Sequence, residues 1–190
     1  MKHKIRHFLL LCALLSPVAS FAQPETLTLD PQHTYLLWHV KHLGFSTQAG
    51  KWYARGTLTV DEKKPQDSKV NVIVQVANLI TGDPELDRHL KGDLFFDVAK
   101  YPTATFVSNK VVMTGKQSAK VYGVLTLHGV SKPIVLNVKL NLAGENPVTG
   151  KMTAGFSGTT TIKRSDFGIN AFLPAVGDDV DINIEAEAYK

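Results

Sequence analysis

The chain has 190 residues, with 21 basic and 17 acidic side chains and a formal net charge of +4. Three of the basic side chains lie within the first six residues, and residues 1–22 contain no Asp or Glu. Without that segment the chain carries 18 basic and 17 acidic side chains, a net charge of +1. This balance gives no general electrostatic case for binding nucleic acid or an anionic membrane. The length suits one domain with a sizeable core.

The N-terminal segment has the features of a cleavable secretion signal. A basic stretch precedes an apolar run at residues 8–15, and Ser20-Phe21-Ala22 places small residues at the −3 and −1 positions. The run is too short for a permanent membrane anchor, which needs about 20 residues. We therefore expect residues 1–22 to be a signal peptide and residues 23–190 to form one exported domain, located in the periplasm of a Gram-negative bacterium.

The single cysteine, Cys12, belongs to the predicted signal peptide. The exported domain therefore has no disulfide bond and no thiol chemistry, which suits an oxidising compartment. We also find no further apolar run of membrane-spanning length in the sequence, so we expect no integral membrane segment.

Apolar and polar residues alternate along most of the remaining chain. The alternation is clearest at residues 36–40, 70–76, 134–142 and 180–186, is looser at 52–60, 104–113, 120–128 and 153–163, and is accompanied by a short strand near 26–29. One-sided alternation is typical of an antiparallel sheet with one apolar face. Eight or nine such strands must cover that face by closing into a barrel or by stacking as a sandwich.

One segment departs from this pattern and reads as a helix. Asp83 is a suitable N-cap, Pro84 a suitable first residue, and Gly92 a suitable terminator, with residues 93–98 as a candidate second helical turn. The stretch 78–103 is the one long insertion between strands. We expect it to form a lid or plug over one end of the sheet structure.

Motifs for catalysis or metal binding are sparse. His39 and His42 lie three apart on a predicted strand and so point to opposite faces, which does not suit a metal pair. Gly155-Phe156-Ser157-Gly158 resembles a nucleophile elbow only superficially, because the second glycine is one position early. We find no phosphate-binding loop or dinucleotide fingerprint. The sequence therefore predicts no catalytic residues, no metal and no cofactor.

The predicted inward positions mix small residues with large aromatic ones. Gly56, Gly123, Ala154 and Gly158 are small, whereas aromatic side chains are spread through strands and loops. Such a mixture fits either an apolar cavity with aromatic walls or a solid core closed by aromatics at its ends. Residue patterns alone leave both arrangements open.

Motifs spread over nearly the whole exported chain carry a resemblance to a known family. They are Leu29-Asp30-Pro31-Gln32-His33-Thr34, Val40-Lys41-His42-Leu43-Gly44-Phe45-Ser46-Thr47, Asp87-Arg88-His89-Leu90, Asp93-Leu94-Phe95-Phe96-Asp97-Val98, Tyr101-Pro102-Thr103-Ala104-Thr105-Phe106, Leu125-Thr126-Leu127-His128-Gly129-Val130-Ser131-Lys132-Pro133, Arg164-Ser165-Asp166-Phe167-Gly168 and Val176-Gly177-Asp178-Asp179-Val180. In this order they resemble the YceI-like proteins, which are exported lipid-binding barrels. Leu86 departs from the family pattern, in which an Arg is usual.

The resemblance implies an all-β fold: an extended antiparallel eight-stranded lipocalin-like barrel with a short helical insertion. It also implies a long apolar tunnel for an isoprenoid lipid such as a polyprenyl phosphate or a quinone, held by a periplasmic carrier or reservoir that is not an enzyme. Two alternatives are an enzyme or accessory factor acting on a lipid head group, and a stress-response barrel with no fixed ligand. A long-chain lipid is thus the expected partner, nucleic acid is not, and an exposed edge strand would permit a homodimer.

Under this interpretation the tunnel wall consists of inward-facing apolar residues. They are Leu36, Trp38, Val40, Val72, Val74, Phe106, Leu125, Leu127, Phe156 and Ile162, with Phe45, Phe95 and Phe167 near the ends. For the polar head of the ligand we nominate His42, Arg164 and Asp166, because a phosphate or carbonyl group needs a strong donor such as a guanidinium. A second interpretation is that Arg164 and Asp166 simply pair in a turn and hold the end of the barrel.

Overall fold

The structure is a computed structural model that describes residues 24–61 and 63–190. The expected signal peptide therefore lies outside the described residues. Within the described ranges, no helix combines the length and apolar character needed to cross a membrane.

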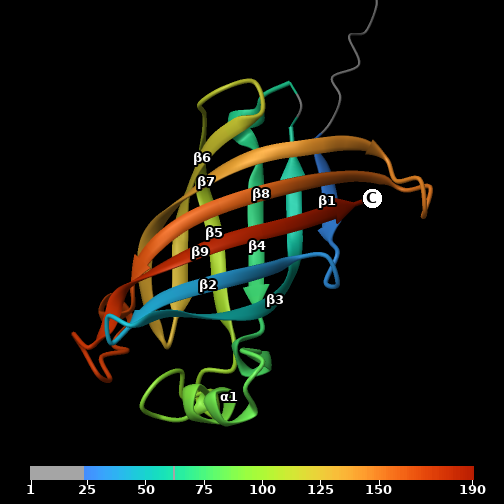
Figure 1. Cartoon of the computed structure of the whole chain (residues 1–190). Coiled ribbons are helices and arrows are strands. Elements are labelled where there is room, and N and C mark those ends of the chain that lie inside the picture. Colours follow the sequence, from blue (N-terminus) through green and yellow to red (C-terminus); the bar gives the residue numbers. More distant parts are fainter. Residues whose placement is uncertain (1–23, 62) are drawn as a thin grey trace, which may run out of the picture.

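Nine antiparallel strands form one sheet that closes on itself (Figure 1). In chain order they are β1 (Glu25–Leu29), β2 (Tyr35–His42), β3 (Ser46–Val60), β4 (Lys69–Val74), β5 (Ala104–Met113), β6 (Ser118–Leu127), β7 (Val130–Glu145), β8 (Met152–Lys163) and β9 (Val176–Tyr189). Short 3-10 helices are η1 (Pro65–Asp67), η2 (Val76–Asn78) and η3 (Arg164–Phe167). Strands adjacent in sequence pair from β2 to β9, and pairing of β2 with β9 closes the ring.

Strands β1 and β2 occupy a single position in the ring, between β3 and β9. Strand β2 pairs with the first half of β3 and with β9 from Val176 to Glu185, whereas β1 pairs with the end of β3 and the end of β9. Nine strands thus fill eight positions. This confirms the antiparallel barrel fold, and it explains why the short segment near residues 26–29 appears as a strand of its own.

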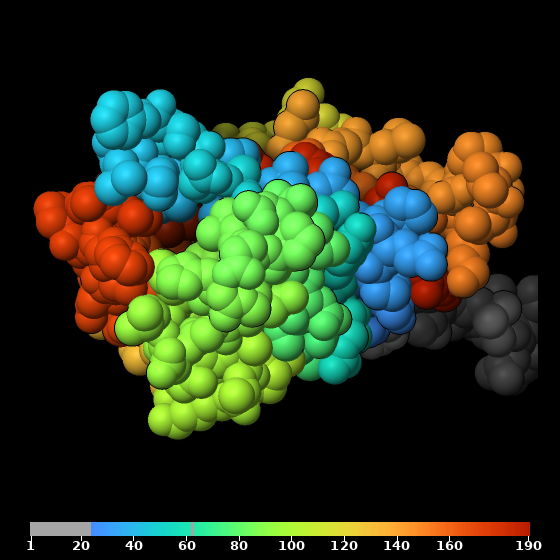
Figure 2. Space-filling view, turned by 60° about the horizontal axis from the view of Figure 1, so that its bottom comes forward, coloured from blue at the N-terminus to red at the C-terminus, as the bar shows by residue number. Residues whose placement is uncertain are grey.

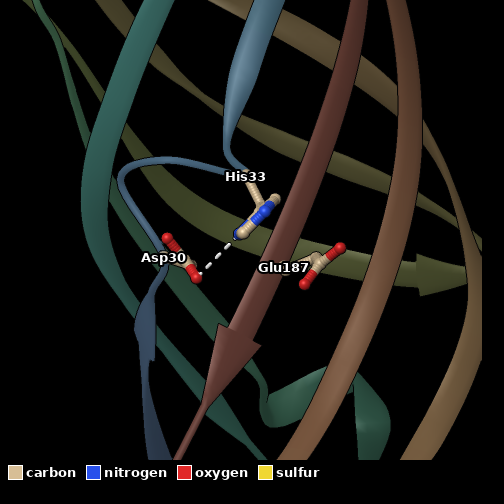
Figure 3. Close-up of side chains that lie close together, drawn as sticks. All are labelled: Asp30, His33 and Glu187. Atoms are coloured by element: carbon tan, nitrogen blue, oxygen red, sulfur yellow. Dashed lines mark hydrogen bonds and ion pairs between the residues drawn. The ribbon is translucent and has the colours of Figure 1, made fainter. Parts of the chain in front are cut away.

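The break between β1 and β2 is a turn held by polar side chains (Figure 3). The Asp30 carboxylate accepts hydrogen bonds from Gln32 N at 2.8 Å and from His33 Nδ1 at 3.0 Å. The carbonyl of Glu187 on β9 accepts from Asp30 N at 2.8 Å and from the Thr34 hydroxyl at 3.2 Å. The turn therefore continues the hydrogen bonding to β9 across the break.

The insertion between β4 and β5 carries the helix α1 (Pro84–Lys91), which covers one end of the barrel (Figure 1). As predicted, Asp83 caps its N-terminus by accepting hydrogen bonds from Glu85 N and Leu86 N, and Gly92 follows its end. Residues 93–98 do not form a second helical turn. Instead, bonds from Phe96 N to Leu90 O and from Val98 N to Lys91 O fold this segment back onto α1 as a series of turns.

The barrel interior divides into two apolar clusters. The larger one lies toward α1 and includes Trp38, Trp52 and Leu125. The smaller one lies where β1 meets β9, and we call it the packed end: Leu27, Leu29, Ala154 and Ala188 are buried there, with Leu58, Val60, Leu140, Phe156 and Ala186 packed around them. We call the α1 side the lid end. The interior is hollow at the lid end and filled at the packed end.

Candidate functional site

An apolar cavity of about 420 Å³ lies inside the barrel at the lid end. This volume falls within the range of small-molecule sites. Residues of every strand from β2 to β9 except β7 form its side walls, and α1 with the following turns covers it. The wall residues are Leu36, Trp38, Val40, His42, Leu43, Gln48, Trp52, Val74, Val76, Leu86, His89, Leu90, Phe95, Phe96, Ala104, Leu125, Leu127, Ile162, Arg164, Ile169, Phe172, Ala175, Val176, Val180 and Ile182.

Two tryptophans build part of the wall where β2 pairs with β3. The Trp38 and Trp52 rings lie 5.8 Å apart between centroids, and Phe96 contacts Trp52 edge-on at 5.3 Å. Trp38 lies directly over Gly50, since a Cβ at that position would come within 2.2 Å of the indole ring. Both indole Nε1 atoms are buried and have no hydrogen-bond partner in the described part of the chain. Leaving these two indole N–H groups unpaired costs about 1–3 kcal/mol each, in a wall that is otherwise apolar.

The polar side chains of the cavity gather near its opening. His42 ends β2, Gln48 lies on β3 opposite Val40, His89 belongs to α1, and Arg164 begins η3. The His89 ring contacts Phe95 at 5.1 Å between centroids, so the lid presents both a ring and a polar nitrogen to this region. Apolar walls with a few polar groups at one end suit a ligand that is apolar along its length and polar at one tip.

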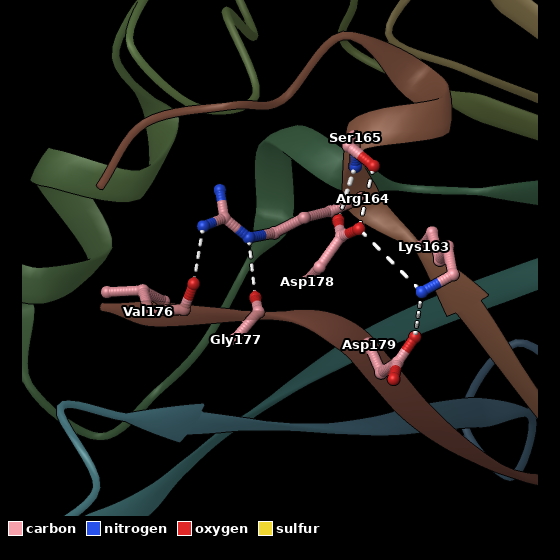
Figure 4. Close-up of polar contacts among 7 residues, drawn as sticks. All are labelled: Lys163, Arg164, Ser165, Val176, Gly177, Asp178 and Asp179. Atoms are coloured by element: carbon pink, nitrogen blue, oxygen red, sulfur yellow. Dashed lines mark hydrogen bonds and ion pairs between the residues drawn. The ribbon is translucent and has the colours of Figure 1, made fainter. Parts of the chain in front are cut away.

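Arg164 is 6% exposed, and its guanidinium binds backbone carbonyls (Figure 4). Nε donates to Gly177 O at 2.8 Å, Nη1 to Ile169 O at 2.9 Å, and Nη2 to Ala171 O at 2.8 Å and to Val176 O at 2.9 Å. One cation therefore holds the loop from residue 168 to 175 against the start of β9. Four of the five guanidinium N–H donors are used in this way.

The positive charge of Arg164 is not neutralised by a direct carboxylate contact. Burial lowers the pKa of its guanidinium, and the nearby charge of Asp178 works in the opposite direction. The Asp178 carboxylate itself accepts hydrogen bonds from Ser165 N at 2.9 Å and Ser165 Oγ at 2.8 Å (Figure 4). The wall near the opening thus combines a retained positive charge with apolar surroundings, which favours an electron-rich ligand group there.

Most of the apolar residues expected on the wall lie there: Leu36, Trp38, Val40, Val74, Phe95, Leu125, Leu127 and Ile162. Of the expected head-group residues, His42 and Arg164 also line the cavity. The sequence did not single out the lid residues Leu86 and Leu90 or the loop residues Ile169 and Phe172 as wall residues. The spacing of Leu86 and Leu90, one helical turn apart, was the available signal for the lid.

Five apolar residues expected on the wall lie elsewhere. Val72 and Phe156 face inward but pack at the packed end, and Phe106 is buried with its ring against Gly123. Phe167 is fully enclosed in η3, where His128 Nδ1 donates to its carbonyl at 3.1 Å. Phe45 is 93% exposed at the β2–β3 turn.

Asp166 is exposed on η3 and does not line the cavity. The expected pairing of Arg164 with Asp166 is also wrong, because the guanidinium uses its donors on four backbone carbonyls. The acidic partner of this turn is Asp178, through Ser165.

A group of possible metal ligands lies outside the cavity, at the strand break shown in Figure 3. Asp30, His33 and Glu187 each offer a ligand atom within 4.8 Å of the others. The hydrogen bond that His33 donates to Asp30, followed by the charges of Asp30 and Glu187, raises the pKa of His33. Burial acts to raise the pKa of Asp30, but its bonds from His33 and Gln32 together lower it. Asp30 and His33 lie close together because their hydrogen bond holds the turn between β1 and β2. This structural role explains the group without a metal ion.

The fold and the partly open apolar cavity inside it define a class of small β-barrels with an interior binding site. The sequence identifies the family: the model of the YceI-like domain matches residues 27–188, and the chain belongs to the YceI-like family. A relative named UPF0312 protein from Pseudomonas savastanoi pv. phaseolicola is 41% identical over 180 residues, covering 94% of this chain and 93% of that protein. A Pseudomonas putida (strain W619) relative is 38% identical over 179 residues, covering 94% and 92%.

Solved structures show the same fold. The YceI protein of Campylobacter jejuni is 33% identical, with a TM-score of 0.68 over 79% of this chain and 89% of that one. BcnA of Burkholderia cenocepacia has a TM-score of 0.73 at 24% identity, covering 84% of this chain and 98% of that one. A polyisoprenoid binding domain from Saccharophagus degradans has a TM-score of 0.64 at 16% identity, covering 86% and 97%.

Proposed function

We propose that this protein binds a long-chain isoprenoid lipid, such as a polyprenyl phosphate or a quinone, and acts as a non-catalytic carrier or reservoir. The observation that carries the proposal is the partly open cavity of about 420 Å³, whose lining is apolar apart from a few residues such as His42, Gln48, His89 and Arg164. Membership of the YceI-like family and the fold shared with a polyisoprenoid binding domain support the same class of ligand.

The size of the cavity sets how much of the ligand it holds. At roughly 30 Å³ for each small group, 420 Å³ accommodates about 14 carbon-sized groups, or about three isoprene units. Burying each carbon contributes about 0.8 kcal/mol, so three units contribute on the order of 10 kcal/mol before the costs of association. A longer chain must therefore extend through the opening or displace side chains at the packed end.

The polar tip of the ligand is placed near His42 and Arg164 in this proposal. The remaining Nη1 donor and the retained charge of Arg164 favour a phosphate or carbonyl oxygen. Because the other guanidinium donors hold the 168–175 loop, Arg164 both anchors the opening and attracts the head group. No reacting group is needed for either task.

Extraction of the purified protein with organic solvent, followed by mass spectrometry, tests the ligand class. We expect an isoprenoid lipid in near-stoichiometric amount. Leu125→Trp should reduce the loading at least tenfold, because the larger ring fills the cavity. Val124→Trp is the matched control, since this neighbour on β6 is 38% exposed and faces outward. A wild-type protein that is reproducibly empty and cannot be loaded would contradict the proposal, as would equal loading of the two variants.

The carrier role also requires export, which we propose from the features of residues 1–22. Protein recovered from the periplasmic fraction should begin at Gln23 when its N-terminus is sequenced. Recovery of the full-length chain from the cytoplasm alone would contradict this part of the proposal and leave the ligand class untouched.

A further inference from the structure

Two loops lie side by side at the opening of the cavity, and we call them the mouth loops. They are the β2–β3 turn at residues 42–46 and the loop at residues 168–175 that leads into β9. Leu43 N donates to Ala175 O at 2.8 Å, and His42 pairs with Val176. They project together from the lid end (Figure 1), and Figure 2 shows a recess between them and the segment that carries α1.

The mouth loops expose large apolar side chains and carry no formal charge. Phe45 is 93% exposed, Phe172 57% and Leu43 50%. Residues 42–50 and 167–177 contain no Asp, Glu, Lys or Arg. Exposed apolar residues are common singly, but three of them on two adjoining uncharged loops form a patch that calls for a partner.

The backbone holds two of these residues in an unfavourable conformation. Leu43 has φ of 53° and Phe172 has φ of 58°, in the left-handed region that Gly or Asn adopts more easily. Asn or Gly at these positions would relieve the strain and remove exposed apolar surface. Strained backbone that presents apolar side chains to solvent is better explained by an interaction than by stability.

The apolar surface of the mouth loops is continuous with the cavity wall. Leu43, Phe172 and Ala175 line the cavity as well as the outer surface, and Phe172 lies 6.1 Å from Phe95 of the lid segment. A partner that binds the mouth loops therefore also contacts the open end of the cavity. A partner with a fluid apolar interior matches both surfaces at once.

We propose that the mouth loops insert into the surface of a lipid bilayer, so that a lipid moves between the bilayer and the cavity without crossing water. This proposal rests on the proposed function, since it supplies the route by which the ligand enters. It needs no positive surface, in agreement with the net charge of +1 for residues 23–190. Insertion is driven by burial of the apolar tips.

A second copy of the chain fits this surface less well. A fully buried aromatic side chain covers about 150–250 Å². Because Phe45, Phe172 and Leu43 are 93%, 57% and 50% exposed, the three tips together offer on the order of 400 Å². A stable protein interface buries about 800 Å² on each partner. The tips also project from the barrel end, a shape that enters a deformable layer more readily than it matches a rigid face.

Vesicle flotation of the full chain, with large unilamellar vesicles of phosphatidylethanolamine and phosphatidylglycerol, tests the proposal. Phe45→Asp should lower the fraction bound at least about tenfold, because a charge replaces the most exposed ring. Val148→Asp is the matched control: Val148 is 91% exposed in the β7–β8 turn, away from the mouth loops, and its replacement should change binding less than twofold. Equal loss in the two variants, or no loss in either, overturns the proposal.

A Phe45→Trp variant gives a second readout. Trp38 and Trp52 are buried, so the added indole should show a blue shift on vesicle addition and quenching by brominated acyl chains. An unchanged spectrum overturns the proposal, as does a concentration-dependent dimer that Phe45→Asp abolishes.

Phe45 lies off the cavity wall, so lipid loaded from detergent should remain within twofold of wild type in Phe45→Asp. If the wild-type protein loads lipid normally but does not bind vesicles, the docking proposal fails and the proposed function stands. If it binds vesicles but never loads lipid, the proposed function fails.

Discussion

The two ends of the barrel are built from the same strands but solve different problems. At the packed end, Leu29 and Ala188 are 4% and 0% exposed, and their neighbours fill the interior. At the lid end, the strands enclose a cavity and the closure depends on α1, on turns and on one buried cation. Close packing at the packed end therefore stabilises the fold, whereas the lid end lacks part of this stabilisation because its interior contains a cavity.

The largest expected effect is the loss of the cation at the lid end. Arg164→Ala should lower the free energy of unfolding by about 4 kcal/mol, because it leaves four backbone carbonyls without their donor. Urea denaturation measures the change. Arg164→Lys retains the charge but not the planar fork, so it should recover only part of the loss. A loss below about 1 kcal/mol for Arg164→Ala would show that the loop is held by other contacts.

A matched pair of leucines compares the packing of the two ends. Leu29→Ala should cost about 3 kcal/mol, because it opens a void in a filled region. Leu36→Ala should cost about 1 kcal/mol, because Leu36 already borders empty space. Urea denaturation of ligand-free protein gives both values. Equal costs would mean that the cavity closes in solution or that the packed end is loose.

The smallest expected effect is a pH dependence at the strand break. The hydrogen bond and charge of Asp30 raise the pKa of His33. The protonated form is thus favoured in the folded state, and its contribution is full below the ordinary histidine pKa and is lost as pH rises through the raised one. The urea midpoint should fall slightly as pH rises above the ordinary histidine pKa of about 6.5. His33→Gln should remove that dependence, and an unchanged slope in this variant would refute the assignment.

The lowered pKa of Asp30 acts in a different range. Its contribution is present above the ordinary aspartate pKa and is lost only as pH falls through the lowered value. It therefore does not interfere with the measurement on His33.

The sequence predicted the inward faces of most strands, but a bulge between Leu140 and Leu142 leaves Leu142 73% exposed. It did not predict which inward residues border empty space. Leu125 and Phe106 both face inward from neighbouring strands, yet only Leu125 lines the cavity, because the Phe106 ring lies over Gly123. A period of two residues specifies a face, whereas packing depends on partners far apart in the chain. Phe156 illustrates the same limit, since its neighbours at the packed end include residues of β1.

The loops were the hardest part to predict, because they have no period. Phe45 was expected at the end of the tunnel and is found at the tip of the β2–β3 turn, where a positive φ at Leu43 precedes it. Arg164 was expected near the ligand and does line the cavity, but its four carbonyl partners depend on the path of the 168–175 loop. Every residue has the same backbone carbonyl, so the pattern of side chains cannot predict which carbonyls accept hydrogen bonds from Arg164.

The helix α1 has a consequence for the timing of ligand exchange. It contains no buried residue, whereas the opposite side of the opening is held by four hydrogen bonds from Arg164. Segments with few buried contacts open locally at a much lower free energy than the whole fold. Amide protons of residues 85–91 should therefore exchange with solvent far faster than those of β8 and β9, since Pro84 carries no amide proton. If so, residence of a bound molecule is governed by the melting of eight helical residues, and every strand pairing can stay intact while it leaves.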